Sequence, residues 1–318
     1  MKKFDFEKLE FVDSFVVFLD ILGFRELVMD DDESKLQKIN FHFHFIEIGL
    51  NKIKEKLIQE YGLDLGIDRQ FKLDYIIISD SIIITMKMIK YDFSDMPKEQ
   101  FKSLQKYFND TNKFKKIKKK KEIQKNLYLA IEEMVNLHNV LNKAAFEKLC
   151  EAVVKSQRYL ASQNVWLRGA ISAGTTHISQ NKKQIVGQAY INAYELEGKA
   201  KYPRVVLDSN ILEALDITSE DEFIENIPYM FSWNDVSLEK DMPLFLDYVG
   251  FLIYVPTDEN RQTLNQIIES LIVGFEESKG HGYHDKYLWS LEYMQVCLER
   301  GGEEYVNLLE NLIKLNKE

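Results

Sequence analysis

SFVVFLDILGF (residues 14–24) is the most informative segment of the chain. Its first part is a continuous run of apolar, aromatic and β-branched residues, which is typical of a strand buried on both faces of a sheet. The run ends at Asp20, and Gly23 then permits a tight turn before a helix that we predict from Arg25. The sequence therefore predicts a central strand whose carboxyl end carries an acidic side chain.

Elements downstream of this strand extend the prediction. Apolar residues at steps of three and four predict a helix over residues 33–61. Two β-rich runs, 71–78 and 82–88, are separated by Ser79-Asp80-Ser81 and predict a hairpin with Asp80 at its tip. The elements that follow are a strand at 166–173, a segment from 184 leading into a helix at 191–200, a strand at 204–208 and a short helix at 210–215. This order predicts an α/β or α+β fold in which helices cover a mixed sheet.

The composition is that of a chain that can fold around a hydrophobic core and that carries more acidic than basic residues. The 318 residues are 45% hydrophobic, and 41 lysines and arginines face 51 aspartates and glutamates, a formal net charge of −10. This charge argues against a dedicated duplex-DNA binder, which needs a basic surface. The sequence has two cysteines, no signal peptide and no apolar run of about 18 residues, so we expect a cytoplasmic protein.

We expect two parts in the chain. Residues 1–215 carry the alternating pattern and form the predicted core domain, interrupted at about 91–126. Residues 216–318 are predicted to form a mainly helical extension, because amphipathic patterns occur at 264–275 and 286–298. Within the interruption, residues 113–125 hold eight lysines and one glutamate. Such a run is typical of a solvated insertion, and the alternative is a contact with a nucleotide, a nucleic acid or a membrane surface.

Asp20 and Asp80 are the two residues whose positions indicate chemistry. Both are predicted at one edge of one sheet, where two carboxylates repel each other unless a cation lies between them. Mg²⁺ and Mn²⁺ prefer such oxygen ligands. The turn after Asp20 also offers a seat for phosphate, because a helix N-terminus presents N–H donors and Gly23 permits a close approach. The alternative for each aspartate is a turn-forming role, and for Gly23 a turn that needs glycine for its geometry.

Four motifs, in this order, resemble the class III nucleotidyl cyclases. FLDILGF (18–24) is similar to their first-strand signature, and Ser79-Asp80 lies where they carry a second metal-binding aspartate on a hairpin. LRGAISAG (167–174) is similar to a later strand, and residues 187–197 to a glycine-led helix. The resemblance covers about residues 14–212. It implies an α+β fold with a ferredoxin-like βαββαβ core, a mixed sheet and helices, to which the helical extension is added.

The resemblance also implies a reaction and its site residues. Asp20, Asp80 and the carbonyl of Ile21 would bind two divalent ions, Mn²⁺ or Mg²⁺. The ribose 3′-hydroxyl of a nucleoside triphosphate would attack the α-phosphate and release pyrophosphate. Members of the family pair head to tail, so the resemblance implies a homodimer with composite active sites. The triphosphate would be held by the backbone amides of Leu22, Gly23 and Phe24.

The chain departs from the family at positions that select adenine and support the transition state. Adenylate cyclases select adenine with a lysine and an aspartate, and the corresponding positions here are Ile76 and Gln184. The asparagine and arginine of the glycine-led helix would fall at Ile191 and Glu195, with Asn192 one residue out of register. These departures leave open a degenerate, non-catalytic homologue or a branch that builds its site differently.

One branch fits the details better. The strings GQAYINAYELE (187–197) and AKYPR (200–204) are similar to the bacterial pyrimidine cyclases of the Pycsar anti-phage system. This resemblance implies that UTP or CTP, with UTP slightly favoured, is cyclised to cUMP or cCMP, which activates an effector downstream. Arg168 and Arg204 are expected to contact phosphate, with a surface salt bridge as the alternative for each. Ser81 is expected beside the substrate.

Three other interpretations remain. The first is a nucleotide sensor on the same fold, against which the retention of both Asp20 and Asp80 argues. The second is an interaction protein whose lysine-rich segment contacts nucleic acid or membrane, although we expect no stable partner of either kind. The third is a purine nucleotide cyclase, against which Ile76 and Gln184 argue.

Overall fold

The computed structural model describes residues 9–24, 73–88, 120–179, 181, 183–227, 229–232 and 244–315, together with eight helical positions between residues 33 and 55. The predicted helix start at Arg25, most of the predicted helix over 33–61 and the predicted insertion as far as residue 119 lie outside the described residues. In the described part of the chain, none of the helices combines the length and the apolar character needed to cross a membrane.

The described strands form a single eight-stranded sheet, in the order β2-β3-β1-β4-β6-β8-β7, with β5 paired to β4. β1 is antiparallel to both of its neighbours, and β4 is parallel to β6. The strand bounds are β1 (Val12–Ile21), β2 (Leu73–Ile78), β3 (Ser81–Lys87), β4 (Leu167–Ser179), β5 (Gln184–Gly187), β6 (Val205–Leu207), β7 (Met230–Ser232) and β8 (Leu244–Leu246).

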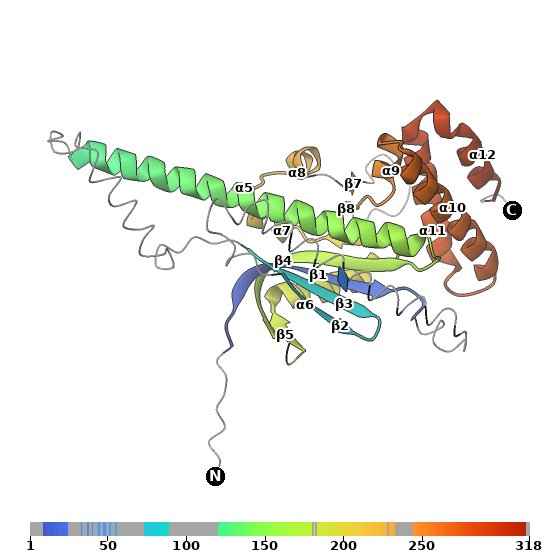
Figure 1. Cartoon of the computed structure of the whole chain (residues 1–318), viewed down its shortest axis with the longest axis horizontal. Coiled ribbons are helices and arrows are strands. Elements are labelled where there is room, and N and C mark those ends of the chain that lie inside the picture. Colours follow the sequence, from blue (N-terminus) through green and yellow to red (C-terminus); the bar gives the residue numbers. More distant parts are fainter. Residues whose placement is uncertain are drawn as a thin grey trace, which may run out of the picture.

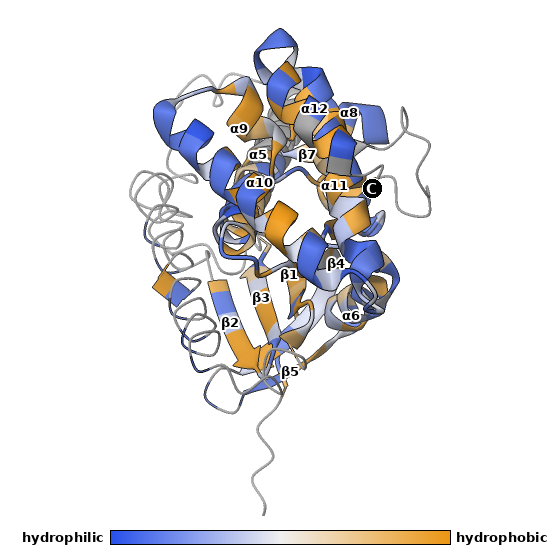
Figure 2. Ribbon diagram, turned by 90° about the vertical axis from the view of Figure 1, so that its right-hand side faces the viewer, coloured by the Kyte–Doolittle hydropathy of each residue, from blue (hydrophilic) through white to orange (hydrophobic). Residues whose placement is uncertain are grey.

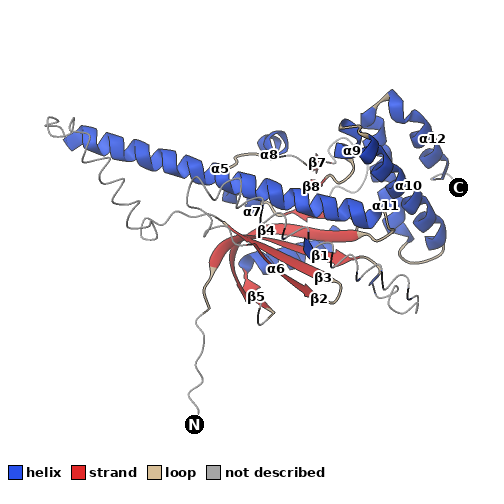
Figure 3. Cartoon of the chain, in the orientation of Figure 1, coloured by secondary structure: helices blue, strands red, loops and turns tan. Residues whose placement is uncertain are grey.

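Helices cover both faces of this sheet. Figure 3 shows the long helix α5 along one face and α6 on the opposite face, and Figure 1 shows the C-terminal helices gathered at one end. The helix bounds are α5 (Lys120–Ala161), α6 (Gln188–Ala200), α7 (Asn210–Ala214), α8 (Glu220–Asn226), α9 (Gly250–Tyr254), α10 (Asp258–Ser278), α11 (His284–Gly301) and α12 (Val306–Leu315), with a 3₁₀ turn at Glu303–Tyr305.

The α+β class with a mixed sheet is confirmed. The antiparallel order β2-β3-β1-β4, with helix between β3 and β4, is compatible with a ferredoxin-like βαββαβ core. The predicted insertion at 91–126 ends earlier than expected, because residues from Lys120 onward already belong to α5. This 42-residue helix continues to Ala161, and its N-terminal half projects beyond the sheet (Figure 1).

β1 is buried on both faces, as its unbroken apolar run predicts. Phe15, Val17 and Leu19 enter the large core shared with α5, where the Phe15 ring lies 5.1 Å from that of Phe146. The alternate residues Val16 and Phe18 enter a smaller cluster beneath α6. Figure 2 shows the hydrophobic colour along β1 and β3. Because side chains alternate along a strand, Asp20 faces the α6 side of the sheet.

Small residues form much of the face of α6 that packs on the sheet. Ala189 and Ala193 are fully buried against Val16 and Phe18. Gly187 precedes the helix with φ 149°, and a Cβ there would collide with the carbonyl oxygen of Thr175. Glycine is therefore required where the chain passes from β5 into α6.

The sheet and its core continue across residue 215, the boundary expected between core and extension. β8 pairs with β6, and β7 pairs with β8, so the C-terminal segment adds strands as well as helices. Phe245, Trp289 and Tyr293 belong to the same buried cluster as Phe15. The described residues after 215 are therefore an integral layer of the fold, because they complete its sheet and core.

Replacing Gly198 by alanine is expected to stabilise the protein. Gly198 lies on the exposed side of α6, and a Cβ there would meet no described heavy atom within 4 Å. Alanine reduces the conformational freedom of the unfolded chain, which is worth about 0.5–1 kcal/mol at such a position. Chemical denaturation measures the change. Gly187→Ala, in the same segment, should lower the free energy of unfolding, and a loss of stability in Gly198→Ala would show that this face of α6 is covered.

Candidate active site

A row of side chains crosses the sheet at the end of β1. Strand pairing aligns Ile78 with Ser81, Ser81 with Asp20, and Asp20 with Arg168, across β2, β3, β1 and β4. The backbone N–H of Ile21 donates to the carbonyl oxygen of Asp80 at 3.2 Å, which holds the hairpin loop against the end of β1. Asp20 and Asp80 therefore lie at the same edge of the sheet.

The hairpin that carries Asp80 is tighter than the sequence predicts. β2 ends at Ile78 and β3 begins at Ser81, so Ser79 and Asp80 alone form the loop. Ser79 adopts φ 57°, the positive value that the first residue of a two-residue hairpin loop often requires. Ser81 is thus a strand residue beside Asp20, while Asp80 is half-buried in the turn.

Arg168 joins two carboxylates in the middle of this edge. Its guanidinium lies 3.0 Å (Nη2) and 3.1 Å (Nε) from Oδ2 of Asp20. The same group pairs with Oε1 of Glu197, a buried residue of α6. Arg168 therefore forms a partly buried salt bridge with the carboxylate expected to bind metal, which is close to the salt-bridge alternative, and its contact with phosphate stays a prediction.

Burial and mutual repulsion raise the pKa values of Asp20 and Glu197 in this cluster. Burial raises the pKa of Asp20 above its ordinary value, the positive charge of Arg168 opposes this, and the negative charge of Asp80 raises the pKa further. The pKa of Glu197 is likewise raised by burial, opposed by Arg168 and raised by Asp20 and Asp80. Three carboxylates thus share one electrostatic environment, and this is an arrangement that a further cation would stabilise.

Two residues of this cluster were not predicted. Glu197 shares the buried stripe of α6 with Ala189, Ala193 and Ala200, and a lone acid among small buried residues is the signal that could have revealed it. Lys286, in the first turn of α11, is close enough for its charge to lower the pKa of Asp20. The position of α11 relative to β1 depends on tertiary packing, so no local sequence pattern predicts where Lys286 lies.

The turn after Asp20 corrects one expected phosphate contact. The amide of Leu22 donates to the carbonyl oxygen of Trp166 at 2.9 Å, so it is engaged in holding the end of β1 against β4. Gly23 adopts φ 76°, which explains why glycine occupies this turn, and Phe24 follows at the start of a helix. Of the three expected amide donors, the Leu22 amide is therefore committed to the fold.

The structure also contradicts the expectation that Arg204 contacts phosphate. Its side chain is 0% exposed, and its Nε donates to the carbonyl oxygen of Ala200 at 3.2 Å. The guanidinium lies 5.6 Å from the ring of Tyr202 and 5.7 Å from that of Trp289. Because aromatic rings enclose the cation, Arg204 stabilises the core between β6 and α11, and neither phosphate contact nor a surface salt bridge describes it.

The positions that depart from the cyclase pattern have distinct environments. Ile76 is buried in β2 and aligned with Ile83, which packs beneath α6. Gln184 and Glu195 are exposed, and Asn192 is half-buried. Ile191 is 50% exposed on the outer face of α6. Neither of the expected α6 positions, 191 and 195, therefore belongs to the buried stripe that carries Glu197.

The donor set at this edge fits a divalent ion that shares its coordination with substrate. Among the described residues, no group of three or more His, Cys, Asp or Glu side chains could hold a metal ion. Mg²⁺-type ions are commonly bound by one or two carboxylates, with substrate phosphates and waters completing the shell. Asp20, Asp80 and the Ile21 carbonyl match that incomplete set, provided that Arg168 releases Asp20.

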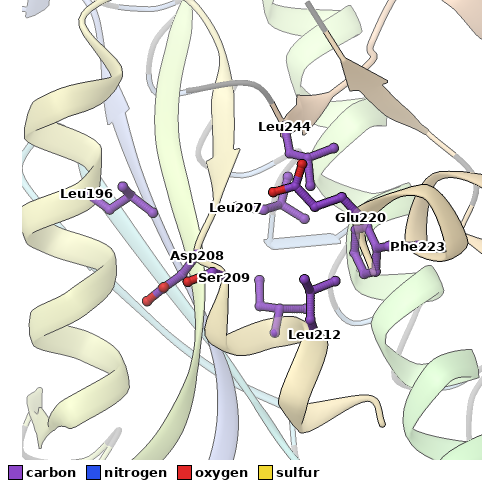
Figure 4. Close-up of a pocket in the computed structure, with 9 residues that line it drawn as sticks. Leu196, Leu207, Asp208, Ser209, Leu212, Glu220, Phe223 and Leu244 are labelled. Carbon is purple, nitrogen blue, oxygen red and sulfur yellow. The ribbon is translucent and has the colours of Figure 1, made fainter. Parts of the chain in front are cut away.

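A separate pocket of about 230 Å³ lies between α6, β6, α7 and α8. Figure 4 shows Leu196 on one side, Phe223 and Leu244 on the other, and Asp208 between them. Oδ2 of Asp208 already accepts a hydrogen bond from Ser172 at 2.8 Å. The lining is mostly apolar and contains no lysine or arginine among the described residues, so it does not suit a triphosphate.

Comparison of the chain with models of known protein families gives no match, and comparison with curated proteins gives none either. The sequence motifs and the geometry of the Asp20–Arg168–Glu197 cluster are therefore the features that bear on function.

Metal-free protein is expected to lose stability as the pH rises, in part through Glu197. Its pKa is raised in the folded state, so the folded chain binds this proton more tightly than the unfolded chain. The resulting stabilisation is present below the unfolded value of about 4.3 and is lost as the pH rises through the folded pKa. Urea denaturation across this range in EDTA should show a shallower pH dependence in Glu197→Gln than in the wild type. Glu195→Gln, on the exposed side of α6, is the control, and an unchanged slope in Glu197→Gln would contradict the assignment.

Proposed function

We propose that this chain is a metal-dependent pyrimidine nucleotide cyclase of the class III type, which converts UTP, or CTP, into the 3′,5′-cyclic monophosphate and pyrophosphate. The observation that carries the proposal is the convergence of Asp20 and Asp80 at one sheet edge, with Arg168 on the adjacent strand. The burial of Asp20 supports a functional role, because a turn-forming aspartate gains nothing from desolvation beside a second carboxylate.

In this proposal, one set of residues binds the metal ions and another binds the phosphates. Asp20, Asp80 and the carbonyl of Ile21 would hold two Mn²⁺ or Mg²⁺ ions, which lower the pKa of the ribose 3′-hydroxyl and neutralise charge on the leaving group. Arg168 exchanges its Asp20 contact for a phosphate oxygen while Glu197 keeps its guanidinium in place. The 3′-oxygen then bonds to the α-phosphorus, its proton leaves to solvent, and the bond between the α-phosphorus and the bridging oxygen breaks to release pyrophosphate.

The active unit in this proposal is a homodimer with composite sites. The outer side of α6 and the neighbouring β5 expose Ile191 (50%), Tyr194 (56%) and Val186 (43%). Tyr194 also packs edge-on against Phe18, so the exposed patch is continuous with the cluster beneath α6. An apolar patch that runs from β5 along α6, the helix that carries Glu197, suits a second copy of the chain, which would complete each site.

The proposal of a pyrimidine substrate rests on the absence of the two adenine-selecting residues from this sequence. Ile76 and Gln184 stand where adenylate cyclases carry their adenine-selecting lysine and aspartate. Ile76 is buried in β2 and cannot supply the missing charge. UTP is favoured slightly over CTP by the resemblance, and in this role the cyclic product is a cytoplasmic signal that activates a defence effector.

A panel of four nucleotides tests this proposal. Purified protein is incubated with ATP, GTP, CTP or UTP in Mn²⁺, and the products are separated and weighed by mass spectrometry. We expect a cyclic pyrimidine monophosphate. A cyclic purine monophosphate would overturn the base assignment and keep the reaction.

A nucleotide sensor on the same fold is the second candidate, favoured by the exposed Ile191 and Glu195 in place of asparagine and arginine. It predicts tight binding of a nucleoside triphosphate with no cyclic product. Calorimetry with UTP and CTP beside the product assay separates the two.

A further inference from the structure

Arg168 occupies the carboxylate that the proposed function assigns to metal. Its Nη2 and Nε lie 3.0 Å and 3.1 Å from the same atom, Oδ2 of Asp20. Because Asp20 and Arg168 are aligned residues of β1 and β4, the sheet itself holds the two side chains together. A guanidinium in this position uses the carboxylate oxygen as its acceptor and places a positive charge beside it. A divalent cation must therefore compete with Arg168 for Asp20.

Glu197 gives the guanidinium a second carboxylate. Its Oε1 pairs with Nε of Arg168 from α6, the helix on the face of the sheet that Asp20 shares (Figure 3). The side chain of Glu197 is 7% exposed, against 16% for Asp20 and 27% for Arg168. Glu197 is thus the buried partner of the arginine, and Asp20 is the partner that solvent and a phosphate can reach. Arg168 can leave Asp20 and still keep a carboxylate, which avoids the cost of an unpaired charge.

A nucleoside triphosphate supplies the negative charge that draws Arg168 away from Asp20. Arginine binds phosphate with the same fork of N–H donors that it offers to a carboxylate. When the guanidinium turns to phosphate, the oxygen atoms of Asp20 become available as ligands. Binding of the nucleotide then raises the affinity of the site for the ion, and by linkage the ion raises the affinity for the nucleotide.

We propose that Arg168 gates the metal site: in the free protein its guanidinium holds Asp20 and keeps the affinity for a divalent cation low, and the phosphates of the bound nucleotide release that carboxylate. The protein then takes up metal and nucleotide together and binds metal weakly by itself. The identity of the anion comes from the proposed function, on which this inference rests, whereas the gate comes from the contacts of Arg168 with Asp20 and Glu197.

Mn²⁺ binding by the full chain without nucleotide, followed by electron paramagnetic resonance of the free ion, tests the gate without turnover. Arg168→Gln removes the charge and keeps an N–H donor, so it should bind Mn²⁺ about 10- to 100-fold more tightly than the wild type. Arg168→Lys keeps the charge and should stay within about threefold of the wild type. Asp20→Asn in the Arg168→Gln background should remove the gain, because Asp20 is the ligand that the gate releases.

Glu197→Gln tests the gate without changing Arg168. With Glu197 uncharged, the guanidinium should hold Asp20 more firmly, and Mn²⁺ should bind about 3- to 10-fold more weakly than to the wild type. Arg261→Gln is the matched control, because Arg261 is exposed and pairs with Glu304. Thermal unfolding identifies any variant that has lost its fold. Unchanged Mn²⁺ affinity in a folded Arg168→Gln or Glu197→Gln protein would overturn the gate, and so would a gain in Arg168→Gln that survives Asp20→Asn.

The cyclase assay separates failure of the gate from failure of the proposed function. A wild type that makes cyclic nucleotide, with unchanged Mn²⁺ affinity in Arg168→Gln, would overturn the gate and leave the enzyme intact. A wild type that makes no product, together with tighter Mn²⁺ binding by Arg168→Gln through Asp20, would overturn the enzyme and leave the gate.

Discussion

Asp20→Asn and Asp80→Asn should each reduce cyclic nucleotide formation by at least about 1,000-fold, because metal-assisted charge stabilisation is worth several kcal/mol and each 1.4 kcal/mol is a factor of ten. Asp20 lies on β1 and Asp80 in the loop between β2 and β3, and the backbone hydrogen bond from Ile21 to Asp80 holds these two segments together, so each carboxylate should matter separately. Initial rates in saturating UTP and Mn²⁺ measure the loss.

Folding must be separated from chemistry in these variants. Asp20→Asn also weakens the contact with Arg168, whereas Asp80 is half-buried in a turn, so the second variant is the cleaner test. Asp221→Asn, exposed on α8, is the control for removal of one charge. Retention of a tenth or more of the activity in a folded Asp80→Asn protein would exclude Asp80 as a metal ligand.

A chain that ends at residue 215 should fail to fold. It lacks β8 and β7, which continue the sheet beyond β6, and it lacks the helices that bury Phe245, Trp289 and Tyr293. The aromatic enclosure of Arg204 would also be lost, leaving a buried cation without its rings. Burial of each large apolar side chain stabilises by about 1.5–3 kcal/mol, so the loss of these three rings alone removes roughly 5–9 kcal/mol, which is comparable to the 5–15 kcal/mol stability of a typical domain.

Circular dichroism with thermal unfolding checks this prediction. The truncated chain should be insoluble or should lack a cooperative transition, whereas a chain that ends at residue 315 should unfold like the full protein. A soluble 1–215 fragment with the wild-type transition temperature would show that the C-terminal layer is a separable domain.

The central strand and its acidic end could be predicted because their signals are local. A short unbroken apolar run rich in β-branched and aromatic residues is typical of a strand covered on both faces, and β1 is covered by α5 and α6. The hairpin follows from two β-rich runs with a polar break, which places Asp80 at the same edge as Asp20. Strand alternation then fixes the face that Asp20 shares with Arg168.

The rest of the site depends on contacts between residues far apart in the sequence. Arg204 precedes a strand, where a cation often lies at the surface, yet Phe245 and Trp289 enclose it. α11 reaches the end of β1 because Tyr287 packs on Trp166, whose carbonyl oxygen accepts the Leu22 amide. β7 and β8 are three residues each, which is too short for a periodic pattern to predict.

The stoichiometry of the reaction with UTP is the measurement that bears most directly on the proposed cyclase activity. Wild-type protein in Mn²⁺ should convert UTP into cyclic UMP and pyrophosphate in equal amounts, and EDTA should stop both. CTP in place of UTP, giving cyclic CMP, would leave the account intact and settle the base. Release of inorganic phosphate without a cyclic product, or no reaction with any of the four nucleotides, would contradict the proposal that this site is a nucleotide cyclase.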